Sequence, residues 1–251
     1  METATFAGVF GAIVGSFLNV VVYRLPRRES LVRPASHCPA CGVAVRPYDN
    51  VPVLSWLLLR GRCRDCSAPI GARYPLVEAL TALLCVGAVL AGSGAAAIAL
   101  DVALILLLVP IALIDVEHRI IPNRLTGLGA VLALAIGTTL DPSGESERLI
   151  AGVAAGGALL LAALAYPGGM GMGDVKLAGV MGLFLGSAVI PAMLVALFAG
   201  VLFGALVVAR KGARAARKTA VPFGPFLAFG SLVAVFAGAP LVDWYTTHFL
   251  R

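Results

Sequence analysis

The sequence predicts an all-α polytopic membrane protein of about eight transmembrane helices, with a small cytoplasmic four-cysteine zinc-binding insertion after the first helix. The 251 residues are 60% hydrophobic and only 13% charged, with a mean hydropathy of +0.96. Soluble domains carry about 25% charged residues. The apolar residues fall in long blocks, and a helix needs about 20 residues to cross the hydrocarbon core of a bilayer.

Eight apolar blocks are candidate membrane spans, separated by segments rich in glycine and proline. They are expected at residues 4–22, 75–91, 96–114, 125–140, 149–166, 175–188, 190–209 and 224–241. The first block is expected to stay in the protein as a helix, because it lacks the basic residues that precede the apolar core of a secretion signal.

The basic residues predict the orientation of these spans. With the N-terminus outside, all but two of the 19 Lys and Arg residues, Arg148 and Arg251, fall in segments that face the cytoplasm. This distribution follows the positive-inside rule. The net charge of +6 therefore requires no nucleic-acid partner, and the basic segment 210–218 is also suited to anionic lipid headgroups.

Residues 24–73 form the only polar segment of any size, and 50 residues build too small a core without an added constraint. Two CxxC turns in this segment are typical of four thiolates around a structural zinc ion, since four protein ligands close the coordination sphere. The alternative is a pair of disulfides or a redox-active CxxC, which a reducing cytoplasm disfavours. The expected Zn²⁺ ligands are Cys38, Cys41, Cys63 and Cys66.

Two aspartates stand at the expected cytoplasmic ends of different helices. Asp115 ends the third span, and Asp174 begins the sixth after a glycine-rich run. Two carboxyl groups in contact share a proton, so that one can activate a water molecule while the other polarises a peptide carbonyl. The preceding glycines can adopt positive φ and let a substrate backbone approach closely. Gly171, Gly173 and Lys176 are therefore candidate substrate-binding residues.

Other interpretations of these aspartates stay open on chemistry alone. Asp174 could be the N-cap of the sixth helix, and Asp115 could mark a helix end near water. A proton- or cation-coupled transporter also uses carboxylates inside the membrane, but near its midplane. A membrane-tethered zinc-ribbon adaptor without catalysis would leave the glycine-flanked Asp174 unexplained.

The motifs as a set resemble the type IV prepilin peptidases, which are GxGD-type membrane aspartyl proteases. The resemblance runs in order over most of the chain and rests on Gly15-Ser-Phe-Leu-Asn-Val-Val-Val-Tyr-Arg-Leu-Pro26, His37-Cys-Pro-Ala-Cys41, Arg73-Tyr-Pro-Leu-Val-Glu78, Gly171-Met-Gly-Asp-Val-Lys176 and Pro222-Phe-Gly-Pro-Phe226. It implies that Asp115 and Asp174 are catalytic. It also implies that the enzyme removes the basic leader of prepilins or type II secretion pseudopilins at the cytoplasmic face, ahead of the substrate's hydrophobic helix.

The resemblance further implies a bacterial inner-membrane location and, for members with four cysteines, N-methylation of the new N-terminus by S-adenosylmethionine. Segment 24–73 is too small for a βαβ nucleotide fold, so no residue is assigned to this cofactor, and a peptidase without methylation is the alternative. The expected organisation is a first transmembrane helix (1–23), a cytoplasmic four-cysteine domain carrying the methyltransferase region (24–73) and a transmembrane aspartyl protease domain (74–251). The expected partners are prepilin or pseudopilin substrates and membrane lipid.

Overall fold

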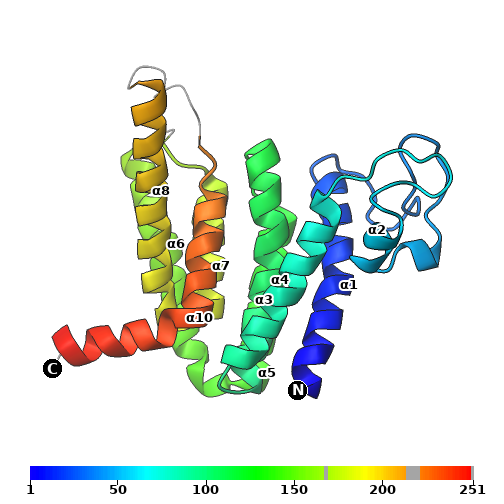
Figure 1. The fold of residues 1–251 in the computed structure, drawn as a ribbon. Coiled ribbons are helices and arrows are strands. Elements are labelled where there is room, and N and C mark those ends of the chain that lie inside the picture. Colours follow the sequence, from blue (N-terminus) through cyan, green and yellow to red (C-terminus); the bar gives the residue numbers. More distant parts are fainter. Residues whose placement is uncertain (167–168, 213–220, 250–251) are drawn as a thin grey trace. The chain divides into compact units, whose positions relative to one another are not determined.

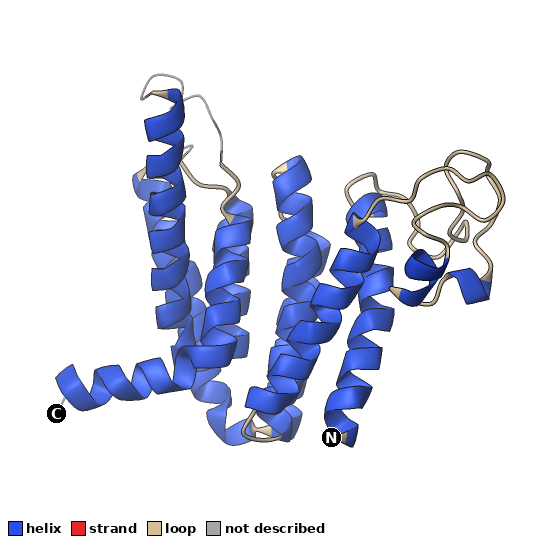
Figure 2. Ribbon diagram, viewed as in Figure 1, coloured by secondary structure: helices blue, strands red, loops and turns tan. Residues whose placement is uncertain are grey.

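The computed structural model describes residues 1–166, 169–212 and 221–249, and these residues form helices and loops without a β-strand (Figures 1 and 2). Each of the eight expected spans corresponds to a helix. These are α1 (Glu2–Arg24), α3 (Arg73–Ala91), α4 (Ala95–His118), α5 (Asn123–Leu140), α6 (Glu145–Ala165), α7 (Met172–Leu185), α8 (Val189–Lys211) and α10 (Gly224–Phe249). Residues 213–218 of the expected basic segment lie outside the described part of the chain.

Six helical stretches of the described chain are long and apolar enough to cross a membrane. The stretch Met172–Lys211 contains both α7 and α8, and α10 contributes a shorter apolar stretch, Gly224–Gly238. The prediction of a polytopic all-α membrane protein is therefore confirmed.

The side chains of α8 illustrate how such a helix faces lipid. Leu194, Phe198 and Val201 are 63%, 67% and 69% exposed, whereas Ala192 and Ala196 are fully buried. Large apolar groups outside and small ones inside reverse the pattern of a helix in water. The arrangement suits a bilayer, where lipid solvates apolar side chains and small residues let helices pack closely.

The chain divides into two compact units, Met1–Ala91 and Gly92–Arg251. In the first unit, α1 packs along α3. A Cβ at Gly11 would lie 2.9 Å from the Cα of Ala82, and one at Gly15 would lie 2.9 Å from the Cα of Glu78. Only glycine permits this approach of two helix backbones. The functional division at residue 73 stays a prediction, because α3 belongs to the same compact unit as α1.

The cysteine segment of the first unit is tied to α3 through Glu78. The segment contains a 3₁₀ turn, η1 (Pro47–Asp49), and a short helix, α2 (Leu54–Leu58). Glu78 Oε2 accepts a hydrogen bond of 2.7 Å from the N–H of Val53, which precedes α2 and has a φ of 60°. Positive φ is strained for a β-branched residue, so the bond to Glu78 stabilises an otherwise unfavourable turn.

The second unit contains α4 to α10, and the chain reverses direction at each connection (Figure 1). Two short 3₁₀ turns, η2 (Pro142–Gly144) and η3 (Gly186–Ala188), join α5 to α6 and α7 to α8. The reversal after α7 occurs at Gly186, whose φ of 55° suits glycine. α6 and α7 pack closely, and a Cβ at Gly182 would lie 2.5 Å from the carbonyl oxygen of Ala151.

Replacing Gly182 by valine should therefore separate α6 from α7 and destabilise the second unit by roughly 1–3 kcal/mol, as overpacking does elsewhere. The matched control is Gly157→Val on α6, because no atom lies within 4 Å of a Cβ at that position. Thermal unfolding of the purified protein in detergent measures the difference. Equal melting temperatures for the two variants would contradict the packing described here.

Candidate active site and metal centre

Asp115 lies in the last turn of α4 and is buried, with 5% of its surface exposed. Its Oδ2 atom accepts a hydrogen bond of 2.9 Å from the backbone N–H of Gly224. Gly224 is the first residue of α10, so this N–H has no partner within its own helix. The N-terminus of α10 therefore satisfies a buried carboxyl group on α4.

The position of Gly224 leaves no room for a side chain. A Cβ there would lie 2.7 Å from Asp115 Oδ2 and 3.1 Å from Asp115 Cγ. This contact joins residues 109 positions apart and was not predicted from the sequence. The local signal was Pro225 in the first turn of α10, which predicts a helix start but not what the helix start contacts.

Asp174 lies in the first turn of α7, whose N-cap is Gly171. The interpretation of Asp174 as the N-cap is therefore wrong, and its own N–H donates to the Gly171 carbonyl at 3.1 Å. The carboxylate folds back over Gly171, where a Cβ would lie 3.2 Å from Asp174 Oδ2. A carboxylate in the first turn of a helix is favourably placed with respect to the helix dipole.

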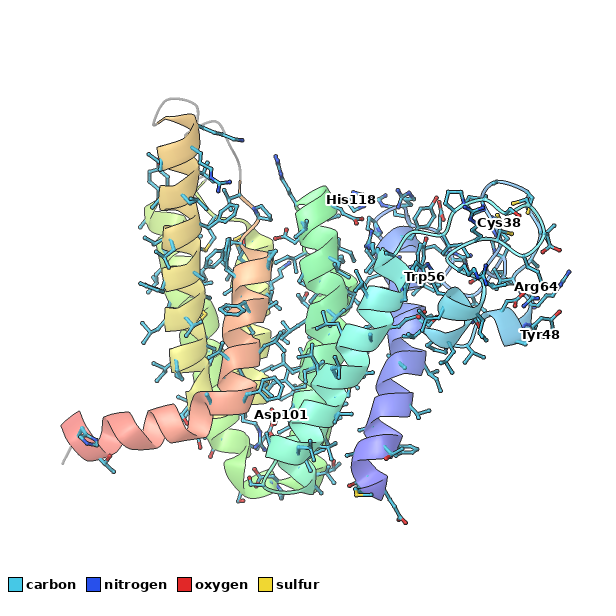
Figure 3. All side chains as sticks on the ribbon, viewed as in Figure 1. Cys38, Tyr48, Trp56, Arg64, Asp101 and His118 are labelled. Carbon is cyan, nitrogen blue, oxygen red and sulfur yellow. The ribbon has the colours of Figure 1, made fainter. Side chains whose placement is uncertain are left out.

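The two aspartates lie on helices of the second unit that contact each other, Asp115 in the last turn of α4 and Asp174 in the first turn of α7. The connection after α4 helps to bring them together, since Ile121 packs against the first turn of α7, 2.9 Å from a Cβ at Gly173. Asp101 lies toward the opposite end of α4 from His118 (Figure 3). It is therefore separate from this pair.

Gly171 and Gly173 do not use the positive φ that glycine allows. Gly171 has φ −78° and ψ 141°, and Gly173 lies within α7. Glycine is required at 173 because of the contact with Ile121. Lys176 Nζ donates to Asn123 Oδ1 at 3.0 Å and so connects α7 to the start of α5. Roles for these three residues in substrate binding remain predictions.

The four cysteines of the CxxC turns form a cluster in the first unit that could hold a metal ion. Their sulfur atoms all lie within 4.8 Å of one another, and Cys38 Sγ is 3.7 Å from Cys66 Sγ. A tetrahedral zinc site with Zn–S bonds of about 2.3 Å has S–S edges of about 3.8 Å. The four are free thiols rather than disulfides, so the donor set fits a tetrahedral thiolate-bound metal.

Each CxxC turn has the same local geometry. In the first turn, Cys38 N–H donates to Val43 and Gly42 N–H donates to Cys38, at 3.0 and 2.9 Å. In the second, Cys63 N–H donates to Ala68 and Ser67 N–H donates to Cys63, at 2.8 and 2.9 Å. The residue after the second cysteine has positive φ in both turns, 73° at Gly42 and 59° at Ser67. Two separate turns thus present their sulfurs in the same way.

The surroundings of the sulfur atoms favour ionisation of one thiol. They oppose ionisation of all four thiols together when no cation is bound. The backbone N–H groups of Cys41 and Ala40 lower the pKa of the Cys38 thiol to about 6. The pKa of the Cys66 thiol is raised to about 12 by desolvation and the neighbouring sulfurs, although the Ala68 N–H lowers it. A bound cation would remove this conflict, because it favours the ionised form of every ligand.

Polar contacts brace the cluster from outside. Arg64 forms a two-pronged ion pair with Asp49, with its shortest N–O distance at 2.6 Å, and lies 5.6 Å from the Tyr48 ring centre (Figure 3). Trp56 packs over Gly61 and donates from Nε1 to the Ile70 carbonyl at 3.0 Å. These contacts hold the second CxxC turn against η1 and α2.

Two family models match successive parts of the chain. Residues 9–91 match the model of the bacterial peptidase A24 N-terminal domain, and residues 102–209 match that of the type IV leader peptidase family. The prepilin leader peptidase/N-methyltransferase of Aeromonas hydrophila is 34% identical over 96% of this chain and 93% of its own length. The chain belongs to the type IV leader peptidase family.

Other members of the family give the same result. The prepilin leader peptidase/N-methyltransferase of Burkholderia pseudomallei (strain 1026b) is 38% identical over 94% of this chain and 85% of its own. That of Myxococcus xanthus (strain DK1622) is 39% identical over 83% of this chain, which spans 64% of that protein's length. No solved structure matches the chain. The leader peptidase match ends at residue 209, so Gly224 lies beyond it.

Replacing Cys63 by serine should remove most of the bound metal from the purified protein, because a tetrahedral thiolate site loses a quarter of its ligands. The matched control is Cys85→Ser, since Cys85 is buried in α3 and is not part of the cluster. Elemental analysis should give about one metal ion per chain for wild type and the control. Full metal content in Cys63→Ser would rule out this cluster as the site.

Proposed function

We propose that the chain is a membrane-embedded aspartyl endopeptidase that removes the basic leader of type IV prepilins or pseudopilins at the cytoplasmic face. The observation that supports the proposal is that Asp115 and Asp174 lie at the ends of two contacting helices, α4 and α7, with a helix N-terminus at each carboxylate. Membership of the leader peptidase family supports the same reaction. The relatives' names supply the substrate class.

The pair has the groups that peptide hydrolysis requires. The ionised aspartate takes a proton from a water molecule, whose oxygen then bonds to the scissile carbonyl carbon. The protonated aspartate donates its proton to the carbonyl oxygen. When the resulting tetrahedral intermediate collapses, the C–N bond breaks and the leaving amine receives the proton that came from water. The backbone N–H of Gly224 holds one carboxyl group in place throughout.

The proposed location is the bacterial inner membrane, with the N-terminus outside and the aspartate pair at the cytoplasmic side. The support is the distribution of basic residues: nine arginines lie between the first and second spans, and the connection between α4 and α5 contains Arg119. In this orientation the C-terminal end of α4, and with it Asp115, reaches the cytoplasmic surface.

We further propose that the cysteine cluster holds a structural Zn²⁺ and that the enzyme also methylates the new N-terminus with S-adenosylmethionine. Thiolate spacing and tetrahedral geometry support zinc. The names of the relatives support methylation. No residue is assigned to S-adenosylmethionine, because residues 24–73 contain no βαβ unit with a glycine-rich loop.

Asp115→Asn and Asp174→Asn should each reduce cleavage of a prepilin in membranes by about 1,000-fold or more, since each removes an acid–base group and keeps the shape. The matched control is Asp101→Asn, on the same helix as Asp115 but near its other end. Immunoblotting for leader removal measures the effect. Near-normal cleavage by either dyad variant would refute the mechanism.

Gly224→Ala should lower the cleavage rate by roughly 10- to 100-fold, because the added methyl group displaces the Asp115 carboxylate by a fraction of an ångström or more. The substrate KM should change little, since the residue contacts the aspartate. Gly204→Ala on α8, where a Cβ meets no atom within 4 Å, is the control. A variant as active as the control would show that the contact with Gly224 does not position Asp115.

Removal of the metal with a chelator should unfold residues 24–73 and weaken methylation more than cleavage, because the aspartate pair lies in the other compact unit. Parallel assays of leader removal and of methyl transfer from labelled S-adenosylmethionine measure the two activities. Zn²⁺ should restore methylation. Equal loss of both activities would contradict the proposed separation.

A further inference from the structure

A shallow groove of about 440 Å³ lies between α5, α6 and α7 in the second unit. Its walls are apolar along most of their length and include Val153 and Leu183. One end is polar, where Lys176 Nζ donates to Asn123 Oδ1 at 3.0 Å. The groove is open rather than enclosed, and Val153 on its wall is 76% exposed. On helices that span the membrane, such a groove faces lipid.

The polar end of the groove lies beside the first turn of α7, which carries Asp174. Lys176 follows Asp174 by two residues on α7, and Asn123 follows Ile121, which packs against the first turn of α7. From Lys176 the groove runs along α7 to Leu183, which is about 10 Å at 1.5 Å per residue. Lys176 and Asp174 point to different sides of α7, because they are two residues apart. A chain that crosses the first turn of α7 from Asp174 to Lys176 therefore enters the apolar part of the groove within two turns of a helix.

The groove has open space at Gly127, where no atom lies within 4 Å of a Cβ. Gly152 and Gly179 also line the groove, but they lie where α6 packs against α7. Small residues on a membrane helix let another helix approach closely. Lys176 would orient a bound chain, since its ammonium group repels a basic segment at this end of the groove. Among the contacts of the described residues, its hydrogen-bond partner is the neutral Asn123, which leaves the positive charge uncompensated.

We propose that this groove receives the apolar helix of the substrate immediately after the scissile bond, with Lys176 turning the basic leader away from it. The inference rests on the proposed function, since it requires a substrate with a basic leader and a following apolar helix. Lys176 would repel such a leader, and the apolar walls would accept such a helix. A second groove of about 320 Å³ lies beside α8, lined by Phe203, Leu206 and Pro222 among others. Arg210 and Lys211 also line it, and its apolar wall is formed by large side chains rather than glycines.

Site-specific photo-cross-linking tests the location directly. The photoreactive residue benzoylphenylalanine replaces Gly127 in one protein, Leu206 beside the second groove in another, and Gly204, which lines neither groove, in a third. All three carry Asp174→Asn, so that prepilin stays uncut, and are irradiated in membranes with the prepilin. We expect cross-links from position 127 to the apolar helix of the prepilin, well above those from the other two positions.

Three results would overturn the proposal: cross-links from 127 no stronger than from 204, stronger cross-links from 206, or cross-links from 127 to lipid in place of prepilin. The readout does not depend on cleavage. If wild type fails to cut prepilin while position 127 still cross-links to it, the proposed peptidase function fails and the groove remains a binding site for this helix.

Kinetics with an otherwise intact enzyme give an independent test. Gly127→Trp fills the groove without meeting protein atoms at its Cβ, so the KM for prepilin should rise about tenfold while kcat changes little. Gly204→Trp should leave both constants unchanged. If wild type cleaves and Gly127→Trp shows an unchanged KM, or a loss confined to kcat, the groove does not bind the substrate helix although the peptidase assignment stands.

Discussion

A carboxyl group buried at the end of an apolar helix needs a partner from within the protein, because lipid and neighbouring apolar side chains offer none. For Asp115 that partner is the free N–H at the start of α10. The requirement explains several features together: α10 must begin at this level, its first residue must lack a side chain, and α4 must end where α10 starts. The position of one carboxylate thus determines how two distant helices meet.

The second aspartate depends on helix packing. Asp174 is carried by α7, whose closest neighbour is α6, and the two helices meet through Gly152, Gly156, Gly179 and Gly182. In a bilayer such packing arises from close van der Waals contact, because apolar side chains gain nothing by leaving lipid. Residues without side chains therefore position both halves of the dyad: Gly224 at Asp115, Gly173 against Ile121, and the glycines between α6 and α7.

Features that depend on local pattern were predictable from the sequence. The eight helices follow from apolar blocks and the cysteine cluster from two CxxC turns. The contact of Gly224 with Asp115 was not, because a helix start says nothing about a residue 109 positions away. The role of the glycines before Asp174 was not predictable for a related reason. Glycine permits both unusual backbone angles and close packing, and only the structure shows that Gly173 serves close packing, against Ile121. The difference has a physical cause. Helix propensity and turn geometry depend on adjacent residues, whereas a tertiary contact joins residues that are far apart in the sequence.

The end of a helix is also where a peptide bond inside a membrane protein substrate is most accessible. Within a helix each N–H is bonded to a carbonyl four residues earlier, so hydrolysis there would first have to break several such bonds in a medium that offers no replacement. The first four N–H groups of a helix have no such partners. A bond just ahead of an apolar helix is therefore exposed while the helix itself stays intact in lipid. Under the proposed function, the aspartates at the ends of α4 and α7 meet the substrate at the level where water, carboxylates and an unprotected peptide bond coincide.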